Sequence, residues 1–205
     1  MNKIILKIPL FLILIILNTD LISQGNQRPV LGITLQTMTF PQRIDFGVSL
    51  GRYSGKNYSQ INLTYGIDIS PDEQHITSYS INIDPFKSYG FGYTHRYFTK
   101  NPFSLFSGFF YGDIVYSRYS CINSSPALTA PTKVDMNVIG IFLGYGISLN
   151  LLSHFTLCGS GGIGYNYGFG TVFYTTAFYQ KESSYQTYDP GFQLKISLLY
   201  HLGGF

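Results

Sequence analysis

Apolar and polar residues alternate one by one over several long stretches of this chain, and this feature constrains its fold most. Between residues 61 and 69 the odd positions are Ile, Leu, Tyr, Ile and Ile, and the even positions are Asn, Thr, Gly and Asp. A period of two places one class of side chain on each face of a β-strand. The alternation recurs in the segments 30–37, 44–50, 89–97, 104–117, 139–149, 155–168 and 192–202. The sequence therefore predicts eight strands.

The lengths of these strands and of the links between them indicate which kind of sheet they form. Most of the strands are longer than the ~5–6 residues of a typical soluble strand, and they match the ~9–11 residues of a tilted strand that crosses a bilayer. Short links are predicted at 51–57, 99–103 and 150–154, whereas the links at 70–88, 118–134 and 169–190 are long. Short turns on one side and long loops on the other are typical of a transmembrane barrel. We predict an all-β fold, a closed antiparallel eight-stranded up-and-down transmembrane barrel.

The composition agrees with a membrane location and excludes other classes. Only 11% of the residues are charged, against ~25% in an ordinary soluble domain. The formal net charge of +3 is spread along the chain and forms no basic tract, so nucleic acid is not an expected partner.

The N-terminus resembles a secretory signal. Lys3 and Lys7 precede the apolar run at 8–17, and Ser23 and Gly25 supply the small residues of a cleavage site. The run is shorter than the ~20 residues that a membrane-spanning helix needs. We expect residues 1–25 to be removed and residues 26–205 to form one barrel domain.

A barrel in lipid reverses the usual arrangement of a protein core. Its apolar side chains face the acyl chains, and its polar side chains face the lumen. This phase assignment places seven ionisable residues inside the barrel, in a polar cluster with a structural role: Arg43, Asp45, Asp68, Arg96, Asp113, Lys195 and His201. Since eight strands enclose a lumen that side chains fill, we predict a plugged barrel. Segments 76–83 and 171–179 leave open longer hairpins or ten strands.

These features together resemble one family of proteins. The Lys-led signal, eight alternating strands and the C-terminal segment LKISLLYHLGGF, which ends at Phe205, are similar to those of small outer-membrane β-barrel proteins. The chain resembles the OmpA-type transmembrane domain and the outer-membrane β-barrel domain proteins common in Bacteroidetes. The resemblance implies a monomer in the outer membrane of a diderm bacterium, surrounded by its lipid. It also implies recognition of the strand ending at Phe205 by the barrel-assembly machinery, with a bulge at Gly203 and Gly204 restoring the phase.

The sequence carries little that indicates catalysis or cofactor binding. The GxGxxG match at 159–164 is followed by a strand-like segment, whereas a dinucleotide site needs a helix there. The four histidines form no metal-binding spacing. We predict no catalytic, cofactor or metal site.

The two cysteines are predicted to lie at opposite ends of the barrel. Cys121 falls in the predicted external link 118–134, and Cys158 begins the seventh strand at the other end. A membrane core ~30 Å thick would separate them, so we expect no disulfide between them.

Three functions stay open at this point. The first is a non-catalytic barrel with an envelope-structural or surface-binding role through its external loops. The second is a soluble secreted β-barrel that binds an apolar ligand. The third is a lipid-modifying outer-membrane enzyme, whose nearest ingredients are His75, Thr77, Ser78 and Ser80.

Overall fold

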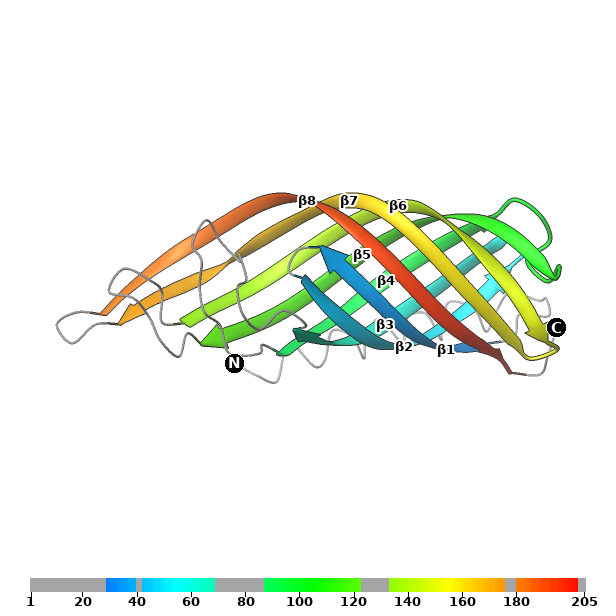
Figure 1. The fold of residues 1–205 in the computed structure, drawn as a ribbon, viewed down its shortest axis with the longest axis horizontal. Coiled ribbons are helices and arrows are strands. Elements are labelled where there is room, and N and C mark those ends of the chain that lie inside the picture. Colours follow the sequence, from blue (N-terminus) through cyan, green and yellow to red (C-terminus); the bar gives the residue numbers. More distant parts are fainter. Residues whose placement is uncertain (1–28, 40–41, 69–86, 123–132, 176–179, 203–205) are drawn as a thin grey trace, which may run out of the picture.

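Eight antiparallel strands pair in chain order and close into one barrel, as the computed structural model shows (Figure 1). The structure describes residues 29–39, 42–68, 87–122, 133–175 and 180–202, without the side chains at some strand ends, those of Arg43, Asp68 and Cys121 among them. The strands are β1 (Pro29–Thr39), β2 (Gln42–Ser54), β3 (Asn57–Asp68), β4 (Lys87–Phe98), β5 (Phe106–Ile122), β6 (Lys133–Leu152), β7 (Phe155–Thr175) and β8 (Gln180–His201). The predicted eight-stranded up-and-down barrel is confirmed. Among the described residues, no helix has the length and apolar character to cross a membrane.

The two ends of the barrel differ in their links. At the short-turn end, β2 and β3 pair as far as Ser54 and Asn57, and Gly55 in the turn between them has a φ of 60°, which favours glycine. The predicted link 51–57 was therefore too long, because the ladder continues almost to the turn. The β6–β7 link at this end is also tight, since β7 starts at Phe155 soon after β6 ends.

At the opposite, long-strand end, the last four strands project beyond the others. Strands β1 to β4 have 11 to 13 residues, whereas β5 to β8 have 17 to 22. Figure 1 shows them continuing past the end of β1 as a curved sheet. The predicted loop at 169–190 was largely wrong, because strand covers 169–175 and 180–190, as the alternative of a longer hairpin at 171–179 had left open in part. The predicted loop at 118–134 was too long, because strand covers 118–122 and 133–134; its residues 123–132 lie outside the described residues. The predicted link 70–88 lies outside the described residues, apart from the start of β4.

The cysteines follow this revised strand assignment. Cys121 belongs to β5, not to a loop, and pairs in register with Val134 of β6. Cys158 pairs with Ser148 near the other end of β6, and it is a buried free thiol. The register thus places the backbones of the two cysteines far apart along the barrel.

Side chains alternate between the outer wall and the lumen along every strand. Apolar side chains of the outward phase are exposed, for example Ile33 at 66%, Val48 at 61% and Ile147 at 60%. The inward phase is buried and includes many polar residues. The barrel therefore has an apolar outside and a polar interior.

Glycines of the inward phase make room for a large side chain. Gly144 of β6 and Gly162 of β7 face each other in register, and the ring of Tyr111 from β5 lies over both. A methyl group at either glycine would overlap that ring and the neighbouring backbone. Without these glycines Tyr111 would not fit inside so narrow a barrel.

We predict that Gly162→Val destabilises the barrel by about 1–3 kcal/mol, because the added side chain overpacks the lumen. Gly159→Val is the matched control on the same strand, since a Cβ at Gly159 meets no atom within 4 Å. Urea unfolding of the protein in lipid vesicles measures both changes. Equal losses for the two variants would contradict the assignment of Gly162 to a packed interior.

Candidate functional site

A polar network spans the middle of the lumen and is the main feature of the barrel interior. At its centre the Lys195 ammonium of β8 lies 2.6 Å from the Asp113 carboxylate of β5, and both side chains are almost fully buried. Gln193 donates a hydrogen bond to the same carboxylate oxygen at 2.9 Å. The hydroxyl of Thr94 donates to the other oxygen at 2.6 Å. The buried carboxylate is therefore paired with a cation and accepts two further hydrogen bonds, as a stable buried charge requires.

The network continues from this centre towards other strands. The amide of Asn62 on β3 donates to the hydroxyl of Thr94 at 2.9 Å, and Gln60 donates to Asn62 at 2.6 Å. On the other side, the hydroxyl of Tyr111 donates to the carbonyl of Gln193 at 3.2 Å. Side chains of β3, β4, β5 and β8 thus meet across the lumen, and their contacts hold opposite walls of the barrel together.

The ionisable residues predicted for the interior lie at different levels of the barrel and have different partners. Asp113 and Lys195 form the central ion pair, while Asp45 accepts a hydrogen bond from Gln36 of the neighbouring strand at 2.9 Å. His201 is buried at the short-turn end, where its Nε2 lies 2.8 Å from the hydroxyl of Thr156. The side chains of Arg43 and Asp68 lie outside the described residues, although their backbones face each other in the β2–β3 register.

Arg96 is buried among aromatic rings, away from the central network. Its guanidinium carbon lies 5.2 Å from the ring centroid of Tyr58 and 5.1 Å from that of Phe109. Within the described part of the chain, its Nη1 atom has no hydrogen-bond partner. Cation–π attraction to desolvated rings offsets part of the cost of burying this charge.

Aromatic side chains close the short-turn end around Arg96 and His201. Tyr53 packs against Tyr58, Phe98 and Phe103, and its ring also stacks on His201 at 5.6 Å between centroids. Aromatic rings thus pack together at this end of the lumen, whereas hydrogen-bonded polar groups lie in the middle.

Asn150 fixes the longest link at that end. Its side-chain amide donates to the backbone carbonyls of Pro102 and Ser104 at 2.9 and 2.6 Å. The hydroxyl of Thr156 donates to the Asn150 side-chain carbonyl and also contacts His201. The β4–β5 link is thereby tied to β6, β7 and β8.

Sequence reasoning identified the charged members of the interior but not their uncharged partners. Gln193, Thr94 and Tyr111 complete the shell of Asp113 and Lys195. The phase of the alternation could have indicated two of these partners, because Thr94 and Gln193 fall on the polar side of alternating segments. Tyr111 shares the phase of Asp113, but its residue type did not mark it as a polar partner, since tyrosine is common on both faces of a strand.

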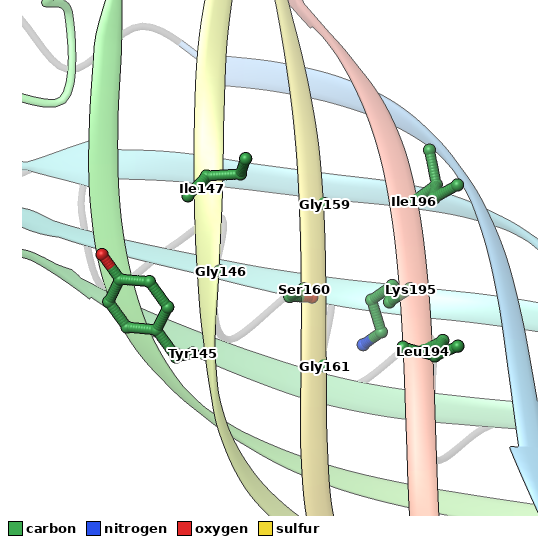
Figure 2. Close-up of a pocket in the computed structure, with 9 residues that line it drawn as sticks. All are labelled: Tyr145, Gly146, Ile147, Gly159, Ser160, Gly161, Leu194, Lys195 and Ile196. Atoms are coloured by element: carbon green, nitrogen blue, oxygen red, sulfur yellow. The ribbon is translucent and has the colours of Figure 1, made fainter.

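The described part of the outer wall carries a shallow groove of about 420 Å³. Figure 2 shows Tyr145 and Ile147 on β6 and Leu194 and Ile196 on β8, on either side of β7 at Gly159 and Gly161. The outward side chains around it are apolar or aromatic, like those of the rest of the wall. Among the described residues, no cluster of His, Cys, Asp or Glu has the arrangement needed to hold a metal ion.

Several solved structures are similar to this barrel over most of its length. The major outer membrane protein of Thermus thermophilus matches with a TM-score of 0.57 and 11% identity, over 87% of this chain and 100% of that chain. The N-terminal β-barrel domain of Pseudomonas aeruginosa OprF matches with a TM-score of 0.52 and 9% identity, over 88% and 100%. The fold is that of a small outer-membrane β-barrel.

A third structure with this small outer-membrane barrel fold is Neisserial surface protein A. Its TM-score is 0.52 at 12% identity, over 87% of this chain and 98% of that chain. No protein-family profile and no curated protein sequence matches the chain. At these identities the likeness shows the fold, and at that level it confirms the resemblance to small outer-membrane barrels.

We predict that Lys195→Met destabilises the barrel by about 3–5 kcal/mol, because it leaves the buried carboxylate of Asp113 without its cation. The double variant Asp113→Asn with Lys195→Met removes both charges, so it should recover most of that loss. Unfolding free energies from urea titration in lipid vesicles provide the double-mutant cycle. If the double variant is no more stable than Lys195→Met, the loss of stability does not come from an unpaired Asp113 carboxylate.

Proposed function

We propose that this chain is a monomeric integral protein of the outer membrane of a diderm bacterium, exported with residues 1–25 as its signal. Its lumen is plugged, and it has no catalytic role. It serves the structure of the envelope or binds at the cell surface through its long-strand end, which faces outward. Its direct partners are outer-membrane lipid and, during assembly, the machinery that recognises the strand ending at Phe205.

The apolar band around the outer wall is the observation that carries this proposal. Along β8 and just past its end, the outward side chains from Phe192 to Leu202 are all apolar or aromatic, and all are 38–56% exposed. These residues extend ~33 Å along the strand, which corresponds to ~25 Å along the axis of a barrel whose strands tilt by ~40°. The band therefore has the height of the ~25 Å apolar belt of outer-membrane barrels.

Exposed aromatic residues lie near both edges of this band. Towards the long-strand end, Tyr89 packs against Tyr65, and Tyr167 stacks on Tyr188 at 4.8 Å between ring centroids. Towards the short-turn end, Tyr200 packs against Phe155. Amphipathic rings at these levels suit the two interfaces of a bilayer, where tyrosine is enriched.

The interior supports a plugged lumen and disfavours the soluble alternative. A soluble barrel that binds an apolar ligand needs an apolar cavity and a polar outer wall, which is the reverse of the arrangement of the described residues. Here Asp113, Lys195 and Gln193 bridge the lumen, and the large apolar side chains of the outward phase are exposed. The residues considered for an enzyme, His75, Thr77, Ser78 and Ser80, lie outside the described residues, and no observation favours that function.

Membrane fractionation with detergent gel electrophoresis tests the proposal directly. We expect the mature protein in the outer-membrane fraction, with a faster-migrating folded band that shifts after boiling, because a closed ladder of eight strands resists detergent at room temperature. Recovery in the soluble fraction without such a shift would refute the membrane role.

The orientation of the wall can be tested with a matched pair of neighbouring residues. We expect Ile141→Cys to react with a membrane-confined thiol probe, because Ile141 is outward and 56% exposed. Phe142→Cys should not react, because Phe142 points inward and is fully buried. Labelling is measured by mass spectrometry in a Cys121→Ala, Cys158→Ala background. The reverse pattern would contradict the phase assignment.

A further inference from the structure

The part of β8 at the long-strand end has a pairing partner on one side only. The β1–β8 ladder runs from Val30 opposite His201 to Met38 opposite Gln193. The β7–β8 ladder continues far beyond this point, to Thr175 opposite Gln180. Residues 180–190 of β8 therefore form an edge that no other strand of the described chain covers. In Figure 1 this edge follows the part of β8 that projects beyond β1.

The direction of the backbone groups along this edge follows from the closed part of the barrel. The N–H of His201 donates to the backbone carbonyl of His154, just before β7, and the N–H of Leu202 donates to the backbone carbonyl of Pro29, the first residue of β1. Backbone groups point to alternate sides along an antiparallel strand, and the β8 register is uninterrupted. The even-numbered residues therefore direct their N–H and C=O groups away from β7. On the open edge these residues are Gln180, Glu182, Ser184, Gln186 and Tyr188.

Pro190 is consistent with this direction. It pairs with Tyr165 within the β7–β8 ladder, and proline has no N–H to donate. Because position 190 is even, the missing N–H would have pointed to the open edge, and the ladder with β7 loses no hydrogen bond. Proline is found in sheets at such edge positions.

We infer that the open edge of β8, residues 180–190, binds an extended segment of another polypeptide, which adds to the sheet as an antiparallel strand. This inference deepens the proposed surface role and rests on it for the location of the edge outside the membrane. The added strand would continue the line of β1, which ends where the edge begins. A row of N–H and C=O groups aimed outward from one strand is the template that such strand addition uses.

Side chains along the edge define the chemistry of the partner. Lys181 and Asp189 belong to the same face of β8, and Tyr188 lies on the opposite face, 74% exposed, with its ring stacked on Tyr167. Opposite charges and aromatic pairs stabilise directly facing positions of neighbouring strands. The partner strand should therefore carry a basic residue opposite Asp189, an aromatic residue opposite Tyr188, and an acidic residue opposite Lys181.

A second copy of the chain in the same membrane does not suit this edge. Two barrels related by a two-fold axis along the membrane normal have their β8 strands ascending in the same sense, so the strands cannot pair antiparallel. A segment that is free to orient has no such restriction. The geometry thus favours a separate extended polypeptide.

The test uses the full mature chain in detergent micelles and the synthetic peptide TKYTVTVTVET as the probe strand. Amide hydrogen exchange is followed by NMR. In the free protein, the amides of Glu182, Ser184, Gln186 and Tyr188 should exchange fast, whereas those of the odd-numbered residues between them should be protected by β7. Saturating peptide should slow the even-numbered amides by about tenfold or more. The charge-swapped peptide TEYTVTVTVKT should bind more weakly.

Variants at one position separate backbone pairing from side-chain contact. Gln186→Pro removes an N–H that points to the open edge, so peptide protection should be lost. Gln186→Ala keeps that N–H and should retain it. Both variants should keep the odd-numbered amides protected, which shows that β7 and β8 still pair. Loss of that protection in Gln186→Pro would overturn the assigned direction of the backbone groups.

Three other results would overturn the inference. Even-numbered amides already protected in dilute free protein would show that the chain covers its own edge. Protection that rises with protein concentration alone would identify a second copy as the occupant. Fast exchange in the presence of peptide would show that no strand adds. Heat-dependent migration and fractionation remain the separate test of the membrane role, so the two failures can be told apart.

Discussion

The hydrogen-bonded ladder that joins β8 back to β1 is the interaction on which the rest of the structure depends. It pairs residues that are distant in sequence, and the hydroxyls of Thr34 and Ser197, 163 positions apart, meet across it at 3.0 Å. Once this ladder closes the sheet, each side chain can point only inward or outward. The alternation of the sequence then decides the chemistry of both surfaces. An open sheet of the same strands would leave the Asp113–Lys195 pair in water, where an ion pair contributes little.

Space inside the barrel is managed by a balance of very small and very large residues. Gly144 and Gly162 have no side chains, and the ring of Tyr111 occupies the space next to them and reaches Gln193. Gln193 in turn holds the carboxylate of Asp113. Packing and electrostatics are thus linked, because the glycines on β6 and β7 allow the tyrosine that helps to satisfy a charge on β5.

The sequence was sufficient for the strand number and for the side of the wall on which most residues lie. Alternation is strongest where one face is apolar, as in β3 and in β8 from residue 192 onward. There the predicted ends lie within one residue of those observed, whereas the start of β3 lies at Asn57, four residues before the predicted alternation. Alternation fails where both faces are polar, as in QKESSYQTYD at 180–189, which was predicted as a loop but extends β8. In the site, charge alone identified Asp113 and Lys195. The uncharged partners and the aromatic surroundings of Arg96 depend on register across the lumen, which a single strand pattern does not contain.

The placement of Arg96 gives the interior a lengthwise electrical asymmetry. Its guanidinium sits among the rings of Tyr58 and Phe109 near the short-turn end. Closer to the middle, the carboxylates of Asp45 and Asp113 outnumber the single ammonium of Lys195, which pairs with Asp113. Positive potential at one end and negative potential further along make an axial dipole in a medium that screens charge weakly. A cation that approached from the short-turn end would meet the repulsion of Arg96 before it reached any carboxylate, so the field of the interior would oppose its entry.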